Sequence, residues 1–457
     1  MLDLLIVIVY FAGMIAVGAY VYGRGKASRR DSFFVADRGG TGLLISGSLC
    51  ATIIGASVVV GMTGLGFERG LTGAWWLLVG SIGLFVLSAF FAGGVRRFGL
   101  YTLPELVEEQ YDKRAGLVAA VLIVVSWVGV IAAQIVAASI VLSILVSCSL
   151  SILMIISAFV FIVYTVLGGQ HSIIRTDFIQ SSILIIGILG CLFCLLARVG
   201  GIEGFTSSLP VEYFSFPVSS NFGWLDLVSF LFLVGSTYVV GPDIYSRLFC
   251  AKSEKVARSS ALLAGSVMIP IAFFIVIIGM GARVLFPDIA SEQAFSTVIQ
   301  EVLPVGISGL VIAALLAAIM SSADTCLLTT STILTEDIYK RIYPSISEER
   351  GLLISRIGIV LMGILALMLA LRLGGVIKSL LLAYTIFTSG VVVPVMVGFY
   401  KDKLKVTPLG ALAAIAGGGG TALVVKLLEV EHFELLGFAV CTLLLFGVSR
   451  IVGKKAL

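Results

Sequence analysis

The segment MSSADTCLLTTSTILTEDIYK (Met320–Lys340) decides how the rest of this chain is interpreted. It continues an apolar run that begins at Gly309, yet it carries a series of hydroxyl side chains and the carboxylates Asp324, Glu336 and Asp337. Polar groups inside an apolar segment are costly unless each of them has a partner. The segment therefore raises the question of what these side chains bind.

The composition of the whole chain identifies its surroundings. Of its 457 residues, 59% are hydrophobic and 12% charged, and the mean hydropathy is +1.14. Soluble globular proteins contain about 25% charged residues. The sequence therefore predicts an all-α integral membrane protein with the lipid bilayer as its solvent. The net charge of +4 gives no indication of a nucleic-acid partner.

Apolar segments recur along the chain at membrane-spanning length. About 20 apolar residues are needed for a helix to cross the bilayer. The N-terminal segment is interpreted as a retained helix, because Arg24 and Lys26 follow it and no basic residues precede it. The sequence predicts about thirteen spans, near 2–22, 42–67, 73–95, 115–146, 150–168, 173–198, 224–246, 258–285, 305–335, 352–372, 376–399, 408–428 and 433–452.

The basic residues predict the orientation. Twenty-four of the 30 Lys and Arg residues fall in alternate connections, the segments 24–38, 96–114, 247–258, 340–356, 401–405 and 450–455 together with Arg175. Cytoplasmic loops carry the excess of Lys and Arg. We therefore expect a multi-pass protein of the cell membrane with its N-terminus outside and its C-terminus in the cytoplasm.

Two of the predicted spans are interrupted by helix-breaking residues. Glycines punctuate the span near 42–67, and Gly235, Gly241 and Pro242 interrupt the span near 224–246. Broken helices at matching positions of two blocks are typical of transporters built from inverted repeats, although glycine also permits close helix packing. The predicted organisation is an N-terminal accessory helix and cytoplasmic loop (1–40), a first repeat (41–200), a second repeat (224–400) and C-terminal accessory helices (401–457).

The hydroxyl groups of the opening segment follow a helical period. Ala318, Ser321, Ser322, Thr325, Thr329 and Thr332 share one helix face, and Asp324 points elsewhere. Hydroxyl oxygens are hard ligands that suit a hard cation. A monovalent cation held by two hydroxyls and by the free carbonyls of a broken helix fits this pattern. The alternative is that each hydroxyl bonds to a carbonyl of its own helix.

The motifs resemble a known family. SSADTCLLTTSTILTEDIYK is similar to the signature of the sodium:solute symporter family, which includes the sodium/proline and sodium/galactose symporters. GMTGLGFERGL, HSIIRTDFIQ and GPDIYSRLFCAKS resemble other segments of that family, in the same order, over about residues 40 to 400. The resemblance implies a LeuT-type fold of five-plus-five inverted repeats with accessory helices, and a sodium-coupled symporter that works by alternating access.

The resemblance also implies ion-binding residues. Na⁺ is the expected coupling ion, with no other metal and no cofactor. The expected sodium ligands are the carbonyls of Ala51, Ile54 and Ala318 and the side chains of Ser321 and Ser322. A second cation, or the route by which the ion leaves, is expected at Asp177, Asp324 and Thr325.

The surroundings of Asp177 are predicted from its spacing. Arg175 lies two residues away and points about 200° around a helix, so it is not expected to neutralise the carboxylate. Because an unpaired carboxylate entering the bilayer is costly, we expect a cation or a water-filled route beside Asp177.

The solute is expected at the middle of the membrane, between the two broken spans. Gln134 is expected either to face this cavity or to form a hydrogen bond between helices. The lining is small and mostly apolar, which favours an amino acid such as proline, or a monocarboxylate, over a hexose. The expected solute-binding residues are Ile53, Ala56, Ser57, Val58, Gln134, Val234, Ser236, Thr237, Tyr238 and Pro242.

Other functions are less consistent with the sequence. An intramembrane enzyme would need a nucleophile with its base, and a channel would need repeated filter loops; neither pattern is present. Cys191 and Cys194 have CxxC spacing in an apolar helix with no neighbouring His, which favours packing. A proton-coupled transporter of the same fold, with Asp177 or Asp324 as proton carrier, is the nearest alternative, followed by a transporter-like sensor.

Overall fold

The computed structural model describes residues 2–23, 30–428 and 435–455. These residues form helices joined by short connections, and the described part of the chain contains no β-strand. The helices are α1 (Leu2–Gly23), α2 (Arg30–Val35), α3 (Gly42–Ile53), α4 (Ala56–Arg69), α5 (Trp75–Val86), α6 (Ala92–Phe98), α7 (Leu103–Gln110), α8 (Lys113–Ser143), α9 (Leu150–Val199), α10 (Gly201–Ser208), α11 (Trp224–Phe230), α12 (Ser236–Val239), α13 (Pro242–Cys250), α14 (Glu254–Leu285), α15 (Ala294–Glu301), α16 (Ile307–Ile333), α17 (Lys340–Ile342), α18 (Glu348–Leu373), α19 (Val376–Phe387), α20 (Val393–Gly398), α21 (Lys401–Leu404), α22 (Pro408–Leu427) and α23 (Leu436–Lys455).

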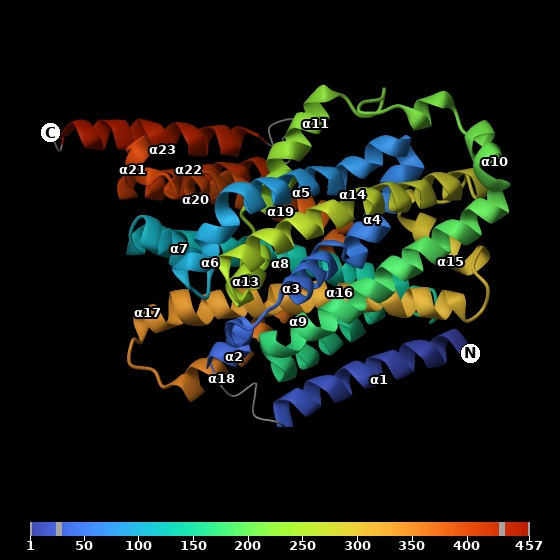
Figure 1. Cartoon of the computed structure of the whole chain (residues 1–457), viewed down its shortest axis with the longest axis horizontal. Coiled ribbons are helices and arrows are strands. Elements are labelled where there is room, and N and C mark those ends of the chain that lie inside the picture. The colour runs from blue at the N-terminus through green and yellow to red at the C-terminus, as the bar shows by residue number, and fades with distance from the viewer. Residues whose placement is uncertain (1, 24–29, 429–434, 456–457) are drawn as a thin grey trace.

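The long helices lie roughly side by side along the longest axis of the molecule (Figure 1). Within the described residues, 10 helical stretches are long and apolar enough to cross a membrane. The predicted class, an all-α membrane protein, is therefore confirmed. Most of the thirteen predicted spans correspond to one helix, or to a pair separated by a break, while the spans near 150–168 and 173–198 both lie in α9.

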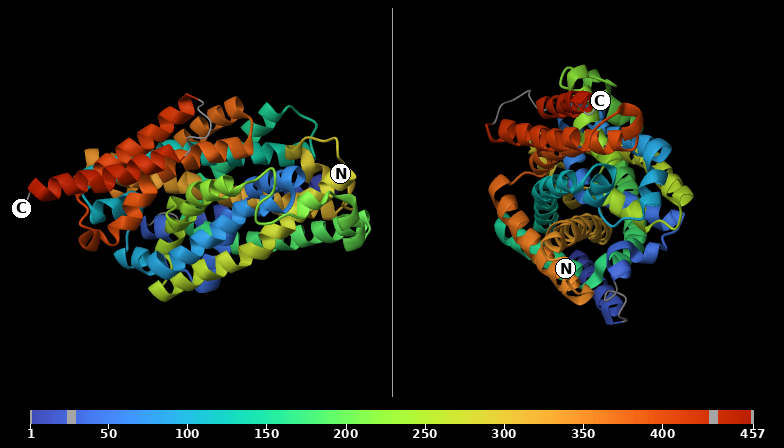
Figure 2. Two further views of the ribbon diagram at one scale, coloured as in Figure 1. Left: turned by 90° about the horizontal axis from the view of Figure 1, so that it is seen from above. Right: turned by 90° about the vertical axis from the view of Figure 1, so that its left-hand side faces the viewer.

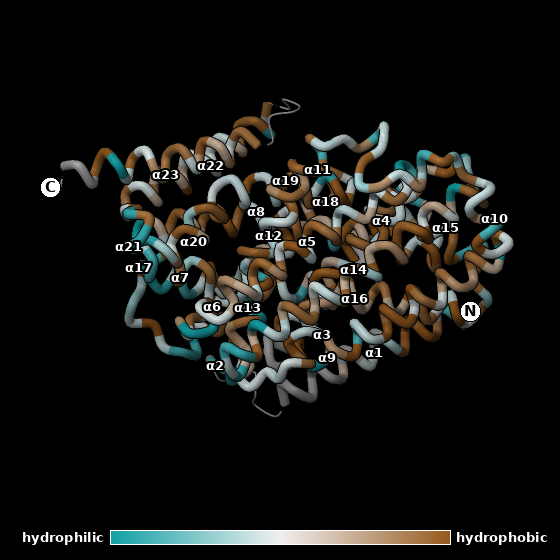
Figure 3. The backbone as a smooth tube through the Cα atoms, turned by 45° about the horizontal axis from the view of Figure 1, so that its top comes forward, coloured by the Kyte–Doolittle hydropathy of each residue, from teal (hydrophilic) through white to brown (hydrophobic). Residues whose placement is uncertain are grey.

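The two termini lie at opposite ends of the bundle (Figures 1 and 2). Helices α2, α7, α17 and α21 gather at the end nearer the C-terminus, which we call the basic end because it holds most of the Lys- and Arg-rich connections (Figure 1). Hydrophilic backbone is concentrated there, whereas the central lengths of the helices are mostly hydrophobic (Figure 3). This placement supports an odd number of crossings. That the basic end faces the cytoplasm stays a prediction.

Both predicted helix breaks are present. Helix α3 ends at Ile53, and α4 starts after Gly55, whose backbone is extended (φ −61°, ψ 156°). In the second broken span, α12 ends at Val239 and α13 starts at Pro242. A proline has no N–H group to continue a helical ladder, but it fits well at a first helical turn. The Gly–Pro pair therefore starts a new helix at this depth.

Helix α9 reverses direction partway along its length, although it is helical from Leu150 to Val199. The Tyr164 hydroxyl lies 3.5 Å from the Thr176 hydroxyl. Twelve residues of straight helix would span about 18 Å, so the chain must turn back between these two positions. The two apolar stretches Leu150–Leu167 and Ile173–Val199 are therefore separate spans, as predicted.

Helix α16 occupies the centre of the bundle and is almost completely enclosed. In the most apolar membrane-length segment of this span, 94% of the residues are buried, whereas the share is 28% in the corresponding segment of Ile173–Val199. It packs against α8, α9 and α18. A helix so enclosed can carry polar side chains, provided that its neighbours supply their partners.

Helices α22 and α23 form a hairpin at the periphery (Figure 1). They bury a small hydrophobic cluster that is separate from the main core. This cluster consists of Ala411, Ala414, Cys441 and Leu445. This hairpin does not contribute to the site described next.

Candidate functional site

The first helix break places free backbone carbonyls beside α16. Because the helical ladder stops at Ile54, the carbonyls of the last turn of α3 lack their usual helical partners. The Ser322 hydroxyl of α16 donates to Thr52 O at 2.8 Å and lies 3.4 Å from Ala51 O. It also lies 3.1 Å from Ala318 O in its own helix. Three carbonyl oxygens therefore converge on one hydroxyl group.

This convergence includes three of the five predicted sodium ligands, namely Ala51, Ala318 and Ser322. Ile54 lies directly at the break. Gly55, the next residue, approaches so closely that a Cβ atom added to it would lie 2.6 Å from Ser322 Oγ. The carbonyl and hydroxyl oxygens gathered here are ligands that suit Na⁺.

Ser321 faces a different partner. Its hydroxyl donates to Asp177 Oδ1, and Ser48 of α3 donates to Asp177 Oδ2. The hydroxyls of Ser321 and Ser322 therefore serve two neighbouring centres, one at the carboxylate and one at the carbonyls. Asp177, in the second half of α9, lies within the core and is completely buried.

Asp177 is also paired with a guanidinium group. Arg247 Nη2 in α13 lies 2.9 Å from Asp177 Oδ2, and both side chains are buried. We expected a cation or a water-filled route beside Asp177; the group found there is the guanidinium of Arg247, which was not identified from the sequence. The reason is that the partner lies 70 residues away in the sequence and reaches Asp177 only through the second helix break.

Arg247 connects several elements at this point. Besides Asp177, its Nη2 atom reaches Thr52 Oγ1 of α3 at 3.0 Å and Thr325 Oγ1 of α16. Within the described part of the chain, its Nε and Nη1 atoms have no hydrogen-bond partner. From the sequence, Arg247 was assigned to a cytoplasmic loop with the neighbouring basic residues. That assignment is wrong, because the side chain is enclosed in the core.

The three residues predicted for a second cation or an ion exit are not brought into one set. Thr325 joins Asp177 through Arg247, and its hydroxyl donates to Ser321 O at 2.7 Å. Asp324 points away from them, as predicted, and its Oδ1 accepts a hydrogen bond from Thr165 in the first half of α9 at 2.8 Å.

The hydroxyl stripe of α16 divides into two parts. Toward the basic end, the stripe residue Thr332 and its neighbour Thr330 each donate to the carbonyl four residues earlier, at 2.7 and 2.6 Å. These are the self-satisfied hydroxyls of the alternative interpretation. Ser321, Ser322 and Thr325 also contact other helices, and Ser322 and Thr325 do so in addition to the carbonyl four residues earlier. The stripe residues that contact partners outside α16 are therefore those that lie close to the helix breaks.

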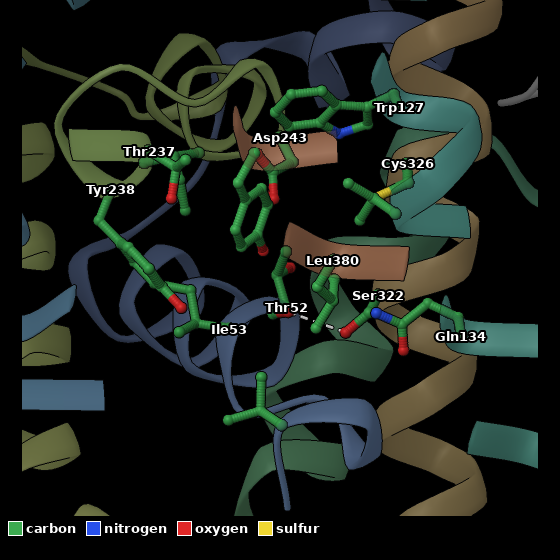
Figure 4. A pocket seen from close by; sticks show the side chains of 14 residues that line it. Thr52, Ile53, Trp127, Gln134, Thr237, Tyr238, Asp243, Ser322, Cys326 and Leu380 are labelled. Atoms are coloured by element: carbon green, nitrogen blue, oxygen red, sulfur yellow. Dashed lines mark hydrogen bonds between the residues drawn. The ribbon is translucent and has the colours of Figure 1, made fainter. Parts of the chain in front are cut away.

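A small cavity lies between the two broken helices (Figure 4). Its volume is about 30 Å³, enough for one or two water molecules. An organic solute can enter only if these walls separate. The lining residues are Thr52, Ile53, Val58, Trp127, Val130, Gln134, Thr237, Tyr238, Asp243, Ile244, Ser322, Cys326, Leu380 and Tyr384.

The structure places half of the predicted solute-binding residues on this cavity. Ile53, Val58, Gln134, Thr237 and Tyr238 line it. Others lie elsewhere: Val234 is packed in the core, the Ser236 hydroxyl donates to Phe232 O, and Pro242 begins α13. The side chains of Ala56 and Ser57 lie outside the described part of the structure.

Sequence reasoning missed the charged and aromatic residues of the cavity. Asp243 follows the Gly241–Pro242 pair and is the one charged side chain among the lining residues. Trp127 and Tyr384, on α8 and α19, add aromatic rings. The GPD sequence could have identified Asp243, since the residue after a helix-starting proline lies directly at the break. Trp127 and Tyr384 carry no such local signal.

Metal and redox sites do not emerge from the described residues, in which no group of three or more His, Cys, Asp and Glu could hold a metal ion. Cys191 and Cys194 are free thiols in α9. Their surroundings agree with the packing role expected from the sequence.

Solved structures share this architecture. A Na⁺-coupled sialic acid symporter in its substrate-bound outward-open state superposes with a TM-score of 0.81, at 20% identity, over 99% of this chain and 98% of that one. Mhp1, a nucleobase-cation-symport-1 family transporter in a closed conformation, gives a TM-score of 0.64 at 15% identity, over 93% and 95% of the two chains. These likenesses confirm the LeuT-type fold.

Sequence relatives give the family. The chain is 28% identical to sodium/glucose cotransporter 4 of Danio rerio, a match that covers 79% of this chain and 61% of that relative. It is 26% identical to the sodium/glucose cotransporter of Vibrio parahaemolyticus, over 94% and 86% of the two chains. The model of the sodium:solute symporter family matches residues 33–418. The chain therefore belongs to the sodium:solute symporter family.

Proposed function

We propose that this protein couples the import of a small organic solute to the entry of Na⁺. The observation that carries the proposal is the convergence of Ala51 O, Thr52 O and Ala318 O on the Ser322 hydroxyl at a helix break. The family, and a Na⁺-coupled symporter among the structural neighbours, support the same coupling ion.

In this proposal Na⁺ binds between α3 and α16. Its ligands are the carbonyls of Ala51, Ile54 and Ala318 with the hydroxyls of Ser321 and Ser322. Ser322 Oγ then directs its oxygen lone pairs to the ion, and Ser321 turns from Asp177 toward it. The buried pair of Asp177 and Arg247 lies directly beside this site.

The solute site is the cavity between the two broken helices. It shares Ser322 with the proposed ion site and Thr52 with the Arg247 cluster. Because the cavity is only about 30 Å³, binding requires the walls to move apart. Rocking of residues 41–200 against residues 224–400 would open the cavity to one side of the membrane at a time, which is alternating access.

The apolar residues of the cavity bear on the class of solute. Two sequence relatives are named as glucose cotransporters, whereas the apolar residues Ile53 and Val58 favour a smaller solute. An amino acid such as proline fits these residues better than a hexose does.

Proton coupling is the second candidate, and Asp324 favours it. Its carboxyl group is buried at the protein centre, where it accepts a hydrogen bond from the neutral Thr165 hydroxyl. A carboxyl group in such surroundings can carry a proton.

Uptake into proteoliposomes at several Na⁺ concentrations and two pH values separates the candidates. With Na⁺ as the coupling ion, uptake follows the Na⁺ gradient and persists without a proton gradient. Asp177→Asn then slows uptake more than it weakens solute binding. If Asp324 instead carries protons, Asp324→Asn abolishes the pH dependence and leaves the Na⁺ dependence intact; the same result for Asp177→Asn would assign the proton to Asp177. Near wild-type uptake by Asp177→Asn would show that Asp177 serves neither the ion nor a proton.

A further inference from the structure

Asp243 has no assigned role, yet it is the one charged side chain on the cavity wall. It is the second residue of α13, and its side chain keeps accessible surface although the surrounding residues of the helix are buried. In Figure 4 its carboxyl group lies between Thr237 and Trp127, two other residues of the cavity wall. The carboxylate is therefore available to a molecule in the cavity.

Asp243 lies in the first turn of α13. The N-terminus of a helix carries partial positive charge, which stabilises a carboxylate in its first turn. The nearest cation in sequence, Arg247, lies one turn further along α13, but its ion pair is with Asp177. Among the described residues, Asp243 forms no ion pair, so its carboxyl group can pair with a cationic ligand.

The second observation is Gln134, on the opposite helix α8. Its side chain is 4% exposed and its Oε1 atom has no hydrogen-bond partner in the described structure. Gln134 lines the same cavity as Asp243. A buried acceptor without a partner costs about 1–3 kcal/mol, so a ligand that donates a hydrogen bond would stabilise it.

Aromatic rings complete the wall. Trp127, Tyr238 and Tyr384 come from three different helices and line this cavity. The faces of aromatic rings attract cations. A carboxylate, an unpartnered carbonyl oxygen and three rings together form a surface that favours positive charge and hydrogen-bond donors.

The charges of the surrounding core also favour a cationic ligand. Asp177 is balanced by Arg247, whereas Asp243 and Asp324 have no cationic partner among the described residues. A cation bound in the cavity would supply the partner that the Asp243 carboxylate lacks, because buried charges require partners.

We infer that the transported solute carries a positively charged ammonium group, which binds the Asp243 carboxylate and donates to Gln134 Oε1. This inference rests on the proposed function, because it assigns the cavity as the solute site. A primary ammonium group has three N–H donors and a ring ammonium such as that of proline has two, and neither has an acceptor. A simple monocarboxylate would instead bring a second negative charge toward Asp243, and a sugar would leave the Asp243 charge uncompensated.

Thermal unfolding of the purified protein tests the inference, using solutes of matched shape and different charge. Prolinamide is a cation, proline a zwitterion and cyclopentanecarboxylate an anion on rings of the same size, and glucose is neutral. Each is added at equal concentration at neutral pH, in NaCl and in KCl. A ligand of the folded state raises the unfolding temperature by mass action.

We expect stabilisation by prolinamide and by proline in NaCl, and none by cyclopentanecarboxylate. Asp243→Asn should weaken the apparent affinity for both ammonium solutes at least about tenfold, and Asp243→Glu should restore part of it. Asp226→Asn is the matched control, because Asp226 also lies at a helix N-terminus, where it accepts from Gly223 N, but it lies outside the cavity. It should leave the order of the solutes unchanged.

Two results would overturn the inference. The first is a response to cyclopentanecarboxylate or glucose that equals or exceeds the response to the ammonium solutes. The second is the absence of any response to the ammonium solutes while NaCl alone still stabilises the protein relative to KCl. A different pair of results would refute the proposed function itself. These are the absence of stabilisation by NaCl alone and solute uptake that does not depend on the Na⁺ gradient. If Asp243→Asn does not fold, the wild-type solute series decides the question.

Discussion

The two broken helices have similar backbone geometry but contribute different chemistry. At the first break, around Gly55, the groups that meet α16 are backbone carbonyls. At the second break, around Gly241, the following helix begins with Pro242 and then presents Asp243 and Arg247. The first break supplies partial charges, and the second supplies full ones.

This difference suits the two breaks to different roles, reversible ion binding and a lasting contact between helices. Carbonyl dipoles can hold a cation weakly enough to release it, since no net charge remains when the ion departs. A guanidinium group in the core must always be paired, because its charge remains there. The carbonyls of the first break therefore suit an ion that comes and goes, whereas Arg247 at the second break suits a permanent link between helices.

The largest effect should come from removing the full charge at the second break. Arg247→Met leaves Asp177 buried without its ion-pair partner, and breaking such a pair from one side costs about 3–5 kcal/mol. We expect low yield and a strongly lowered unfolding temperature. Arg97→Met is the control, because Arg97 pairs with Glu254 at an exposed site. Equal stability of the two variants would show that the Arg247 pair is not the permanent link described here.

An intermediate effect should come from filling the space at the first break. In Gly55→Ala the new Cβ atom would lie 2.6 Å from Ser322 Oγ, so the break and α16 must move apart. Overpacking of this kind costs about 1–3 kcal/mol. Gly190→Ala provides the control, since a Cβ atom there would meet nothing within 4 Å.

The double variant sharpens this prediction. When Ser322 is also changed to Ala, the clashing oxygen disappears, and the next contact of the new Cβ atom is 3.4 Å to the Ser322 Cβ position. Gly55→Ala should therefore destabilise the Ser322→Ala protein much less than it destabilises the wild type. Additive effects of the two substitutions would contradict the close approach of the first break to α16.

The smallest effect on folding, and a specific one on the ion, is expected for Ser322→Ala alone. It removes the hydroxyl on which three carbonyls converge. The apparent Na⁺ affinity should fall at least about tenfold, equivalent to roughly 1.4 kcal/mol, with normal membrane insertion. The Na⁺ dependence of thermal stability and of uptake measures the change. Ser331→Ala serves as the control, because Ser331 pairs with Ser355 away from the breaks. An unchanged Na⁺ dependence in Ser322→Ala would show that Na⁺ does not bind at the first break.

Much of the fold could be predicted because membrane insertion imposes simple rules on the sequence. A span needs sufficient apolar length, and glycine and proline mark the places where a helix stops. Both rules depend on neighbouring residues only. They correctly located the breaks near Gly55 and Gly241 and the two spans within α9.

The site could be predicted only in part, because its key contacts join distant segments. Ser322 was identified through the periodic hydroxyl pattern of α16. Arg247 was misassigned because counting Lys and Arg treats every basic residue near the end of a span as part of a loop. Its burial depends on Asp177, which lies 70 residues earlier. Asp243 was missed because its cavity forms only when α8, α13 and α19 come together.

The enclosed position of α16 has a consequence for the order in which the protein can be assembled during synthesis. The polar side chains of α16 from Ser321 to Thr325 find their cross-helix partners in Thr52, Thr165, Asp177 and Arg247. All of these residues precede Ile307 in the chain, so the ribosome has already made them when α16 emerges. The most polar helix of the core therefore enters the membrane last among its partners, at a point when the groups that receive it are already in place. Chains halted before Ile307 would hold Arg247 without Thr325 and Asp177 without Ser321, and these are the intermediates that quality-control proteases of the membrane would be expected to encounter.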